Sequence, residues 1–62
     1  MTFGERVYKT RMQLNMSQEM LARELGISFA TVNRWEKGHT EPSYKAKQLF
    51  EEFCKHNIIK GE

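Results

Sequence analysis

The sequence predicts an all-α fold, a small bundle of four to five helices within a single domain over residues 1–62. A chain of 62 residues can enclose one hydrophobic core and no more. Hydroxyl residues and glycines stand where helices begin and end, and apolar residues recur between them at helical spacing. The stretch 17–38 shows both signals most clearly, and the rest of the chain is organised around it.

The first helix is expected at about residues 3–12. Thr2 followed by Glu5 is a capping-box pattern, in which each side chain bonds the backbone N–H of the other residue. Leu14, which leads into the next segment, is expected to fill part of the core. The side chains expected to face the core in this helix are Phe3, Val7 and Tyr8, with Arg6 and Lys9 facing water.

Residues 18–25 and 29–37 are expected to form two short helices in close succession. Ser17 and Ser28 are hydroxyl N-caps, and Gly26 and Gly38 stand where each helix ends in the left-handed conformation that suits glycine. Because the link between the two helices is so short, they must cross steeply, which is the helix-turn-helix arrangement. The apolar stripes that face the core are Leu21, Ala22 and Leu25 on the first helix and Val32 and Trp35 on the second.

The outer face of the second of these helices is left free by this arrangement. Phe29 is a large apolar residue on an otherwise polar exposed face, which makes it the informative member. Such a face is either a solvent-exposed surface with no binding role or the binding surface of the domain. Its members are Phe29, Ala30, Asn33, Arg34 and Lys37.

A last helix is expected at about residues 43–55. Pro42 ends any helical continuation from the preceding loop, and Ser43 can cap the new helix. Cys54 is expected at the margin of the core. The apolar positions at helical spacing are Ala46, Leu49, Phe50 and Phe53.

Charge and composition narrow the class of protein. The net charge is only +2, but residues 34–47 hold four Lys/Arg against two Glu, so the basic side carries the second central helix and its exit loop. The single cysteine excludes an internal disulfide and fits a reducing cytoplasm. No apolar run approaches the roughly 20 residues that span a bilayer, and the N-terminus has no export signal. The starting Met favours a self-contained protein.

The spacing of Gln18, Ala22, Gly26, Val32 and Trp35 resembles that of the phage-repressor and Cro-like (XRE-type) helix-turn-helix family. The run Trp35-Glu36-Lys37-Gly38 followed by Pro42-Ser43 is similar to a W-E-x-G-x-x-x-P-S pattern of that family. The resemblance covers roughly residues 3–53. It implies a lambda repressor-like bundle whose third helix enters the major groove of duplex DNA.

By this resemblance, four residues of the third helix read bases. Arg34 suits the O6/N7 edge of guanine, and Asn33 suits N6/N7 of adenine. Phe29 and Ala30 offer only apolar contact, as to thymine methyl groups, where other members carry polar side chains. Arg34 is expected to matter most, then Asn33.

The resemblance also implies contacts with the DNA backbone and one internal ion pair. Helix N-termini suit phosphates, and Gln18 matches the family position that bonds the backbone. Arg11 and Glu36 are expected to pair and tie the first helix to the third. Glu41 stands where members often carry a base. The other expected phosphate contacts are Ser17, Thr31, Lys37, His39 and Thr40.

Catalytic, metal and cofactor sites are not expected. Cys54 and His56 stand at i and i+2 and so point to different faces of a helix, and the chain contains no Asp. Neither His has a Ser or Cys partner at a workable spacing for nucleophilic catalysis. No small-molecule ligand and no membrane contact is evident either.

The sequence therefore predicts a sequence-specific binder of double-stranded DNA, a transcriptional regulator of the cytoplasm and its nucleoid. One small domain rarely reaches useful specificity alone, so a homodimer on a palindromic site is expected. Its candidate surface is the C-terminal end, with Phe50, Phe53, Ile58 and Ile59. Two alternatives stay open: a protein-interaction module, such as an antitoxin or accessory subunit, which Phe29 favours, and the DNA-targeting module of a larger DNA-modifying enzyme.

Overall fold

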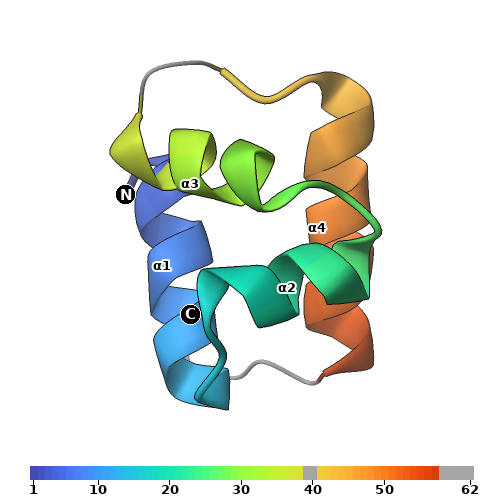
Figure 1. Cartoon of the computed structure of the whole chain (residues 1–62). Coiled ribbons are helices and arrows are strands. Elements are labelled where there is room, and N and C mark those ends of the chain that lie inside the picture. The colour runs from blue at the N-terminus through green and yellow to red at the C-terminus, as the bar shows by residue number, and fades with distance from the viewer. Residues whose placement is uncertain (39–40, 58–62) are drawn as a thin grey trace.

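The computed structural model describes residues 1–38 and 41–57, which form an all-α bundle. Its described helices are α1 (Phe3–Leu14), α2 (Gln18–Leu25), α3 (Phe29–Lys37) and α4 (Tyr44–His56). α1 and α4 stand on opposite sides of the bundle, and α2 and α3 run across the space between them (Figure 1). The fold is the small helical bundle that the sequence predicts, with the central pair of helices at the predicted bounds.

Each of these helices begins at a hydroxyl N-cap. Thr2, Ser17, Ser28 and Ser43 each accept a hydrogen bond from the backbone N–H three residues on. This satisfies one of the N–H groups that a helix start leaves without a partner. At Thr2 the reciprocal bond from the Glu5 carboxylate completes the predicted capping box.

The ends of the helices follow the backbone conformation of the next residue. Gly26 and Gly38 adopt φ values of 70° and 75° and end α2 and α3 as predicted. α1 runs to Leu14, two residues past its predicted end, because Asn15 takes the left-handed conformation at φ 57°. Asparagine tolerates this conformation better than most residues do. α4 begins and ends one residue later than predicted.

The core lies where the four helices meet. Val7, Leu21, Val32 and Phe50 are fully buried, one from each helix. The rest of the core consists of Ala22, Leu25, Trp35 and Phe53, with Phe3, Leu14, Met16, Ile27, Ala46 and Cys54 packed against it. The Phe3 ring meets the rings of Trp35 and Phe50 edge to face, at centroid distances of 5.1 Å and 5.4 Å. These contacts join α1, α3 and α4 in geometries that aromatic pairs prefer.

Three side chains lie differently from the prediction. Tyr8 is 53% exposed rather than in the core, and Leu49 is 39% exposed. Arg6 does not simply face water, because its guanidinium pairs with Glu51 of α4 and lies over a core ring. Each is at the edge of an apolar stripe, where burial depends on the neighbouring helix.

The predicted dimer surface is also wrong in part. Phe50 and Phe53 are 0% and 8% exposed and belong to the core, so they are not free for a second copy. The bundle needs both rings because α4 closes it on the side opposite α1 (Figure 1). Ile58 and Ile59, the other members of that candidate surface, lie outside the described residues.

Gly4 marks the closest approach of two helices. A Cβ at this position would lie 2.2 Å from the Trp35 carbonyl oxygen and 3.2 Å from Glu36 Cα. Only a residue without a side chain lets α1 come this near to the backbone of α3. The contact therefore fixes how α3 sits on the bundle.

Candidate nucleic-acid interface

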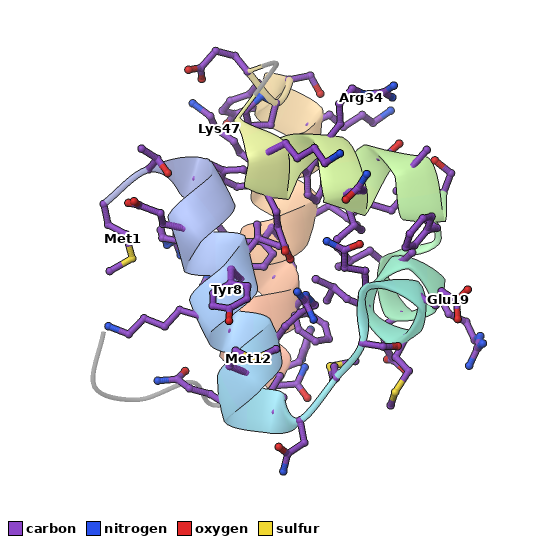
Figure 2. The ribbon with its side chains drawn as sticks, turned by 60° about the vertical axis from the view of Figure 1, so that its left-hand side comes forward. Met1, Tyr8, Met12, Glu19, Arg34 and Lys47 are labelled. Carbon is purple, nitrogen blue, oxygen red and sulfur yellow. The ribbon has the colours of Figure 1, made fainter. Side chains whose placement is uncertain are left out.

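The outer face of α3 is open to solvent. Phe29 is 49% exposed, Ala30, Arg34 and Lys37 are exposed, and Asn33 is half-buried. Figure 2 shows Arg34 projecting outward from α3. The opposite side of the helix packs into the core through Val32 and Trp35. The structure thus brings the four predicted base-reading residues and Lys37 together on one accessible helix face.

A two-pronged ion pair ties this helix to α1. Arg11 Nε donates to Glu36 Oε2 at 2.6 Å, and Arg11 Nη2 donates to Glu36 Oε1 at 2.9 Å. The two side chains are only 10% and 9% exposed. Arg11 also donates to the Met16 carbonyl oxygen at 3.0 Å, so it holds the segment that leads into α2. The two parallel hydrogen bonds fix the position of α3 relative to α1. They also pair the negative charge of Glu36 with the positive charge of Arg11.

Gln18, at the start of α2, is a third member of this network. Its Nε2 donates to Glu36 Oε1 at 3.0 Å. Sequence reasoning missed this bond, since nothing local signals that residues 18 positions apart will meet. Because a carboxylate can only accept, the amide nitrogen must face Glu36, and one N–H remains for a phosphate. The structure therefore orients the side chain that the resemblance assigns to the DNA backbone.

The charge state of Glu36 follows from these contacts. Burial raises the pKa of its carboxyl, but the hydrogen bonds from Arg11 and Gln18 and the charge of Arg11 outweigh burial and bring the pKa below its ordinary value. The same hydrogen bond raises the pKa of the Arg11 guanidinium. The pair is therefore fully charged at neutral pH.

The hydroxyls at the starts of α2 and α3 are partly used by the fold. Ser17 Oγ accepts from the Met20 N–H, which leaves its own O–H free to donate. Ser28 Oγ accepts from the Thr31 N–H and also bonds Thr31 Oγ1 at 2.8 Å, so that pair of hydroxyls keeps one O–H for an outside acceptor. Both helix starts can offer N–H groups and a positive dipole end to a phosphate.

Two of the predicted backbone contacts, His39 and Thr40, lie outside the described residues. Glu41, which follows them, is exposed. Among the described residues no group of three His, Cys, Asp or Glu side chains is placed to hold a metal ion. No helix in residues 1–38 or 41–57 has the length and apolarity to cross a membrane.

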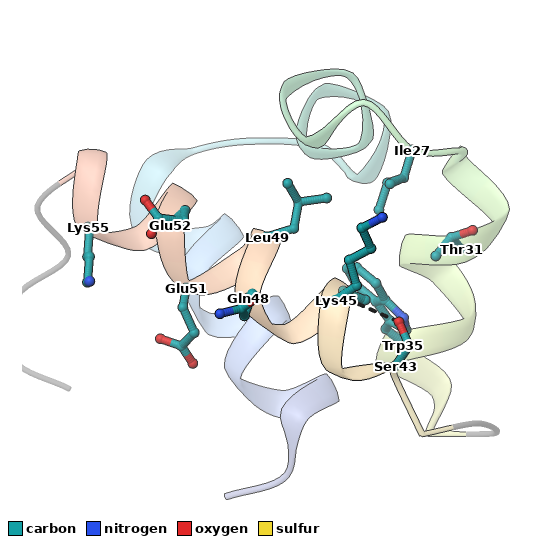
Figure 3. Close-up of a pocket in the computed structure, with 11 residues that line it drawn as sticks. Ile27, Thr31, Trp35, Ser43, Lys45, Gln48, Leu49, Glu51, Glu52 and Lys55 are labelled. Atoms are coloured by element: carbon teal, nitrogen blue, oxygen red, sulfur yellow. Dashed lines mark hydrogen bonds between the residues drawn. The ribbon is translucent and has the colours of Figure 1, made fainter.

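A groove runs between α4 and the turn that joins α2 to α3. Leu49 and Lys45 of α4 reach toward Ile27 across it (Figure 3). Trp35 and Ala46 also line it, together with charged residues of both signs. Sequence reasoning did not find this groove, because it depends on where α4 lies against the central helices.

Comparisons with known proteins agree with this geometry. A helix-turn-helix family model (HTH_3) matches residues 7–54. The chain is similar to the HTH-type transcriptional regulator DicA of Escherichia coli (strain K12), at 42% identity over 50 residues. The match covers 81% of this chain and 36% of DicA, so the chain spans about a third of the length of that curated relative. No solved structure matches at comparable significance.

Proposed function

The chain belongs to the helix-turn-helix family, and we propose that it binds double-stranded DNA sequence-specifically as part of a transcriptional regulator. The observation that supports the proposal most strongly is the outer face of α3. This face presents Asn33 and Arg34, which are adjacent in the sequence. Core contacts and the ion pair between Arg11 and Glu36 hold the helix in place on the bundle. The similarity to DicA, a transcriptional regulator by name, supports the same assignment.

The proposed mechanism follows from the size of the major groove, which is about 12 Å wide and admits one helix. With α3 in the groove, Arg34 donates to guanine O6/N7 and Asn33 bonds adenine N6/N7. Ser17, Gln18, Thr31 and Lys37 contact the flanking phosphates, together with His39 and Thr40. These backbone contacts make the affinity depend strongly on salt.

We also propose that the regulator acts as a homodimer in the cytoplasm, on a palindromic site. Leu49, 39% exposed, and Ile27 give the groove beside α4 an apolar centre. Lys45, Lys55, Glu51 and Glu52 supply charges of both signs around it. Such a patch, apolar at its centre and bordered by charges of both signs, can pack against its own copy across a two-fold axis.

Selection of bound sequences from random duplex DNA tests the proposal. We expect a short symmetric site that contains a guanine in each half. The same selection with Arg34→Ala should lose the preference for that guanine and keep the rest of the site. No enriched sequence, with binding that vanishes at moderate salt, would leave only non-specific contact and contradict the proposed function.

A further inference from the structure

We propose that the first turn of α3 recognises 5-methylpyrimidines, reading the C5-methyl group of thymine or 5-methylcytosine through Phe29 and Ala30. This inference rests on the proposed DNA binding. It specifies which chemical group the bound DNA must carry opposite Phe29 and Ala30. It adds that the chain cannot tell a thymine from a methylated cytosine at these positions by the methyl group. It also predicts that removing one methyl group from the DNA weakens binding.

The first observation is the position of the Phe29 ring. Phe29 is the first residue of α3 and is 49% exposed, and it is not among the side chains of the hydrophobic core or those packed against it. Ala30 beside it is exposed as well. An exposed aromatic ring at the leading end of the groove-reading helix gains little from the fold itself. Its surface is available to a ligand.

The second observation is that the hydroxyls at this end of α3 bond each other and keep only one O–H between them, which is assigned to a phosphate. Ser28 and Thr31 bond each other through their hydroxyls at 2.8 Å, and Ser28 Oγ also accepts the Thr31 N–H. Thr31 lines the groove beside α4 and so lies away from Phe29 on the helix. Within the first turn, the side chains on the outer face that reach base edges are therefore apolar.

The third observation is the order of side chains along the helix. Phe29 and Asn33 are four residues apart and so lie on the same edge of the outer face, and Ala30 and Arg34 form the same relationship on the other edge. Each apolar side chain thus precedes a hydrogen-bonding one by about one helical turn.

The chemistry of the major groove then selects the ligand. The C5-methyl of thymine is the apolar group that an unmodified base pair presents there. Cytosine carries hydrogen at the same ring position, and methylation places the same group at the same point of the groove. An apolar side chain contacts either methyl equally, whereas uracil and cytosine leave it facing water.

The test uses the duplex enriched by the full chain and replaces its thymines one at a time with deoxyuridine. We expect about fourfold weaker binding at one or two positions in each half-site, because each buried methyl contributes about that factor. These positions should differ from the base pairs that Arg34 and Asn33 read. At the same positions, 5-methylcytosine paired with guanine should bind more tightly than cytosine by a similar factor.

Protein variants assign the effect to its side chain. Phe29→Ala should bind thymine and uracil duplexes equally at one of these positions, with an unchanged melting temperature. Met12→Ala, which removes a side chain of similar exposure (45%) from α1, should keep the wild-type preference. A selected site that tolerates uracil everywhere, or a preference that survives in Phe29→Ala, would overturn the inference and leave the proposed function intact. Failure to select any site would instead contradict the proposed function.

Discussion

Gly4 of α1 lies directly against the carbonyl group of Trp35 in α3. A Cβ at Gly4 would be 2.2 Å from that oxygen, well inside any contact that real atoms make. That oxygen belongs to the backbone, which cannot rotate out of the way as a side chain could. The distance between α1 and α3 therefore depends on the absence of a side chain at Gly4. The position of α3 on the bundle depends on it too.

Gly4→Ala should lower the free energy of unfolding by about 2 kcal/mol, because overpacking forces α1 away from α3. Urea denaturation followed by circular dichroism measures the loss. Gly26→Ala is the matched control, since nothing lies within 4 Å of a Cβ there and only its positive φ of 70° opposes the change. We expect about 1 kcal/mol at Gly26. An equal or smaller loss at Gly4 would contradict the packing argument.

Breaking the ion pair between Arg11 and Glu36 should be costly. Arg11→Ala leaves a carboxylate that is 9% exposed without its charged partner, and we expect a loss of about 3 kcal/mol. Affinity for the selected duplex should fall too, because α3 loses its anchor. Glu51→Gln, which alters the exposed pair with Arg6 (35% and 51%), should cost no more than about 0.5 kcal/mol. If Arg11→Ala keeps wild-type melting and affinity, the anchoring role is wrong.

The same carboxylate predicts a dependence of stability on pH. The pKa of Glu36 is lower in the folded chain than in the unfolded one, whose carboxyl titrates near about 4.3. Its stabilisation is therefore fully present above that pH and is lost as the pH falls through the lower, folded pKa. We expect the melting temperature to fall as the pH drops below about 4.3. Glu36→Gln should be less stable at neutral pH and should show a flatter profile; a profile parallel to wild type would show that other groups carry the effect.

Arg34 and Lys37 should differ in what their loss does to DNA binding. Arg34→Ala should weaken binding by about 1–3 kcal/mol at one base pair per half-site and relax the preference there. Lys37→Ala should weaken binding to all sequences alike and reduce the slope of log affinity against log salt by about 1. Titrations at several salt concentrations with matched and guanine-substituted duplexes separate the two. Identical behaviour of the two variants would contradict the assignment of Arg34 to a base.

Leu49→Glu tests the proposed dimer. The substitution places a charge in the apolar centre of the groove beside α4, and light scattering should then show a folded monomer. Met20→Glu is the control, because Met20 is similarly exposed (44%) but lies on α2. Unchanged mass in both variants would remove this face as the dimer contact.

The helix bounds were predictable because their signals are local. Ser17, Gly26, Ser28 and Gly38 each act on the backbone within three or four residues, so their sequence positions place α2 and α3 correctly. The end of α1 was not predictable in the same way. Asn15 ends that helix in a conformation that asparagine can adopt but does not require.

Features that depend on a distant neighbour could not be read from local pattern. Tyr8 and Leu49 lie at the edges of apolar stripes, and only the position of the adjacent helix decides whether an edge is covered. Gly4 sits at an ordinary helical position, and its role depends on the backbone of α3 arriving there. The bond from Gln18 to Glu36 likewise requires the fold before it can be seen.

The hydroxyl caps at the start of each described helix have a consequence for how fast this domain forms. Because Thr2, Ser17, Ser28 and Ser43 specify their helices from neighbouring residues alone, each helix can begin without waiting for distant parts of the chain. Small helical bundles with such short-range organisation fold in microseconds to milliseconds. A ribosome adds only about 5–20 residues per second. The bundle should therefore form within milliseconds once its last helix has left the ribosome, a time shorter than the addition of one residue takes.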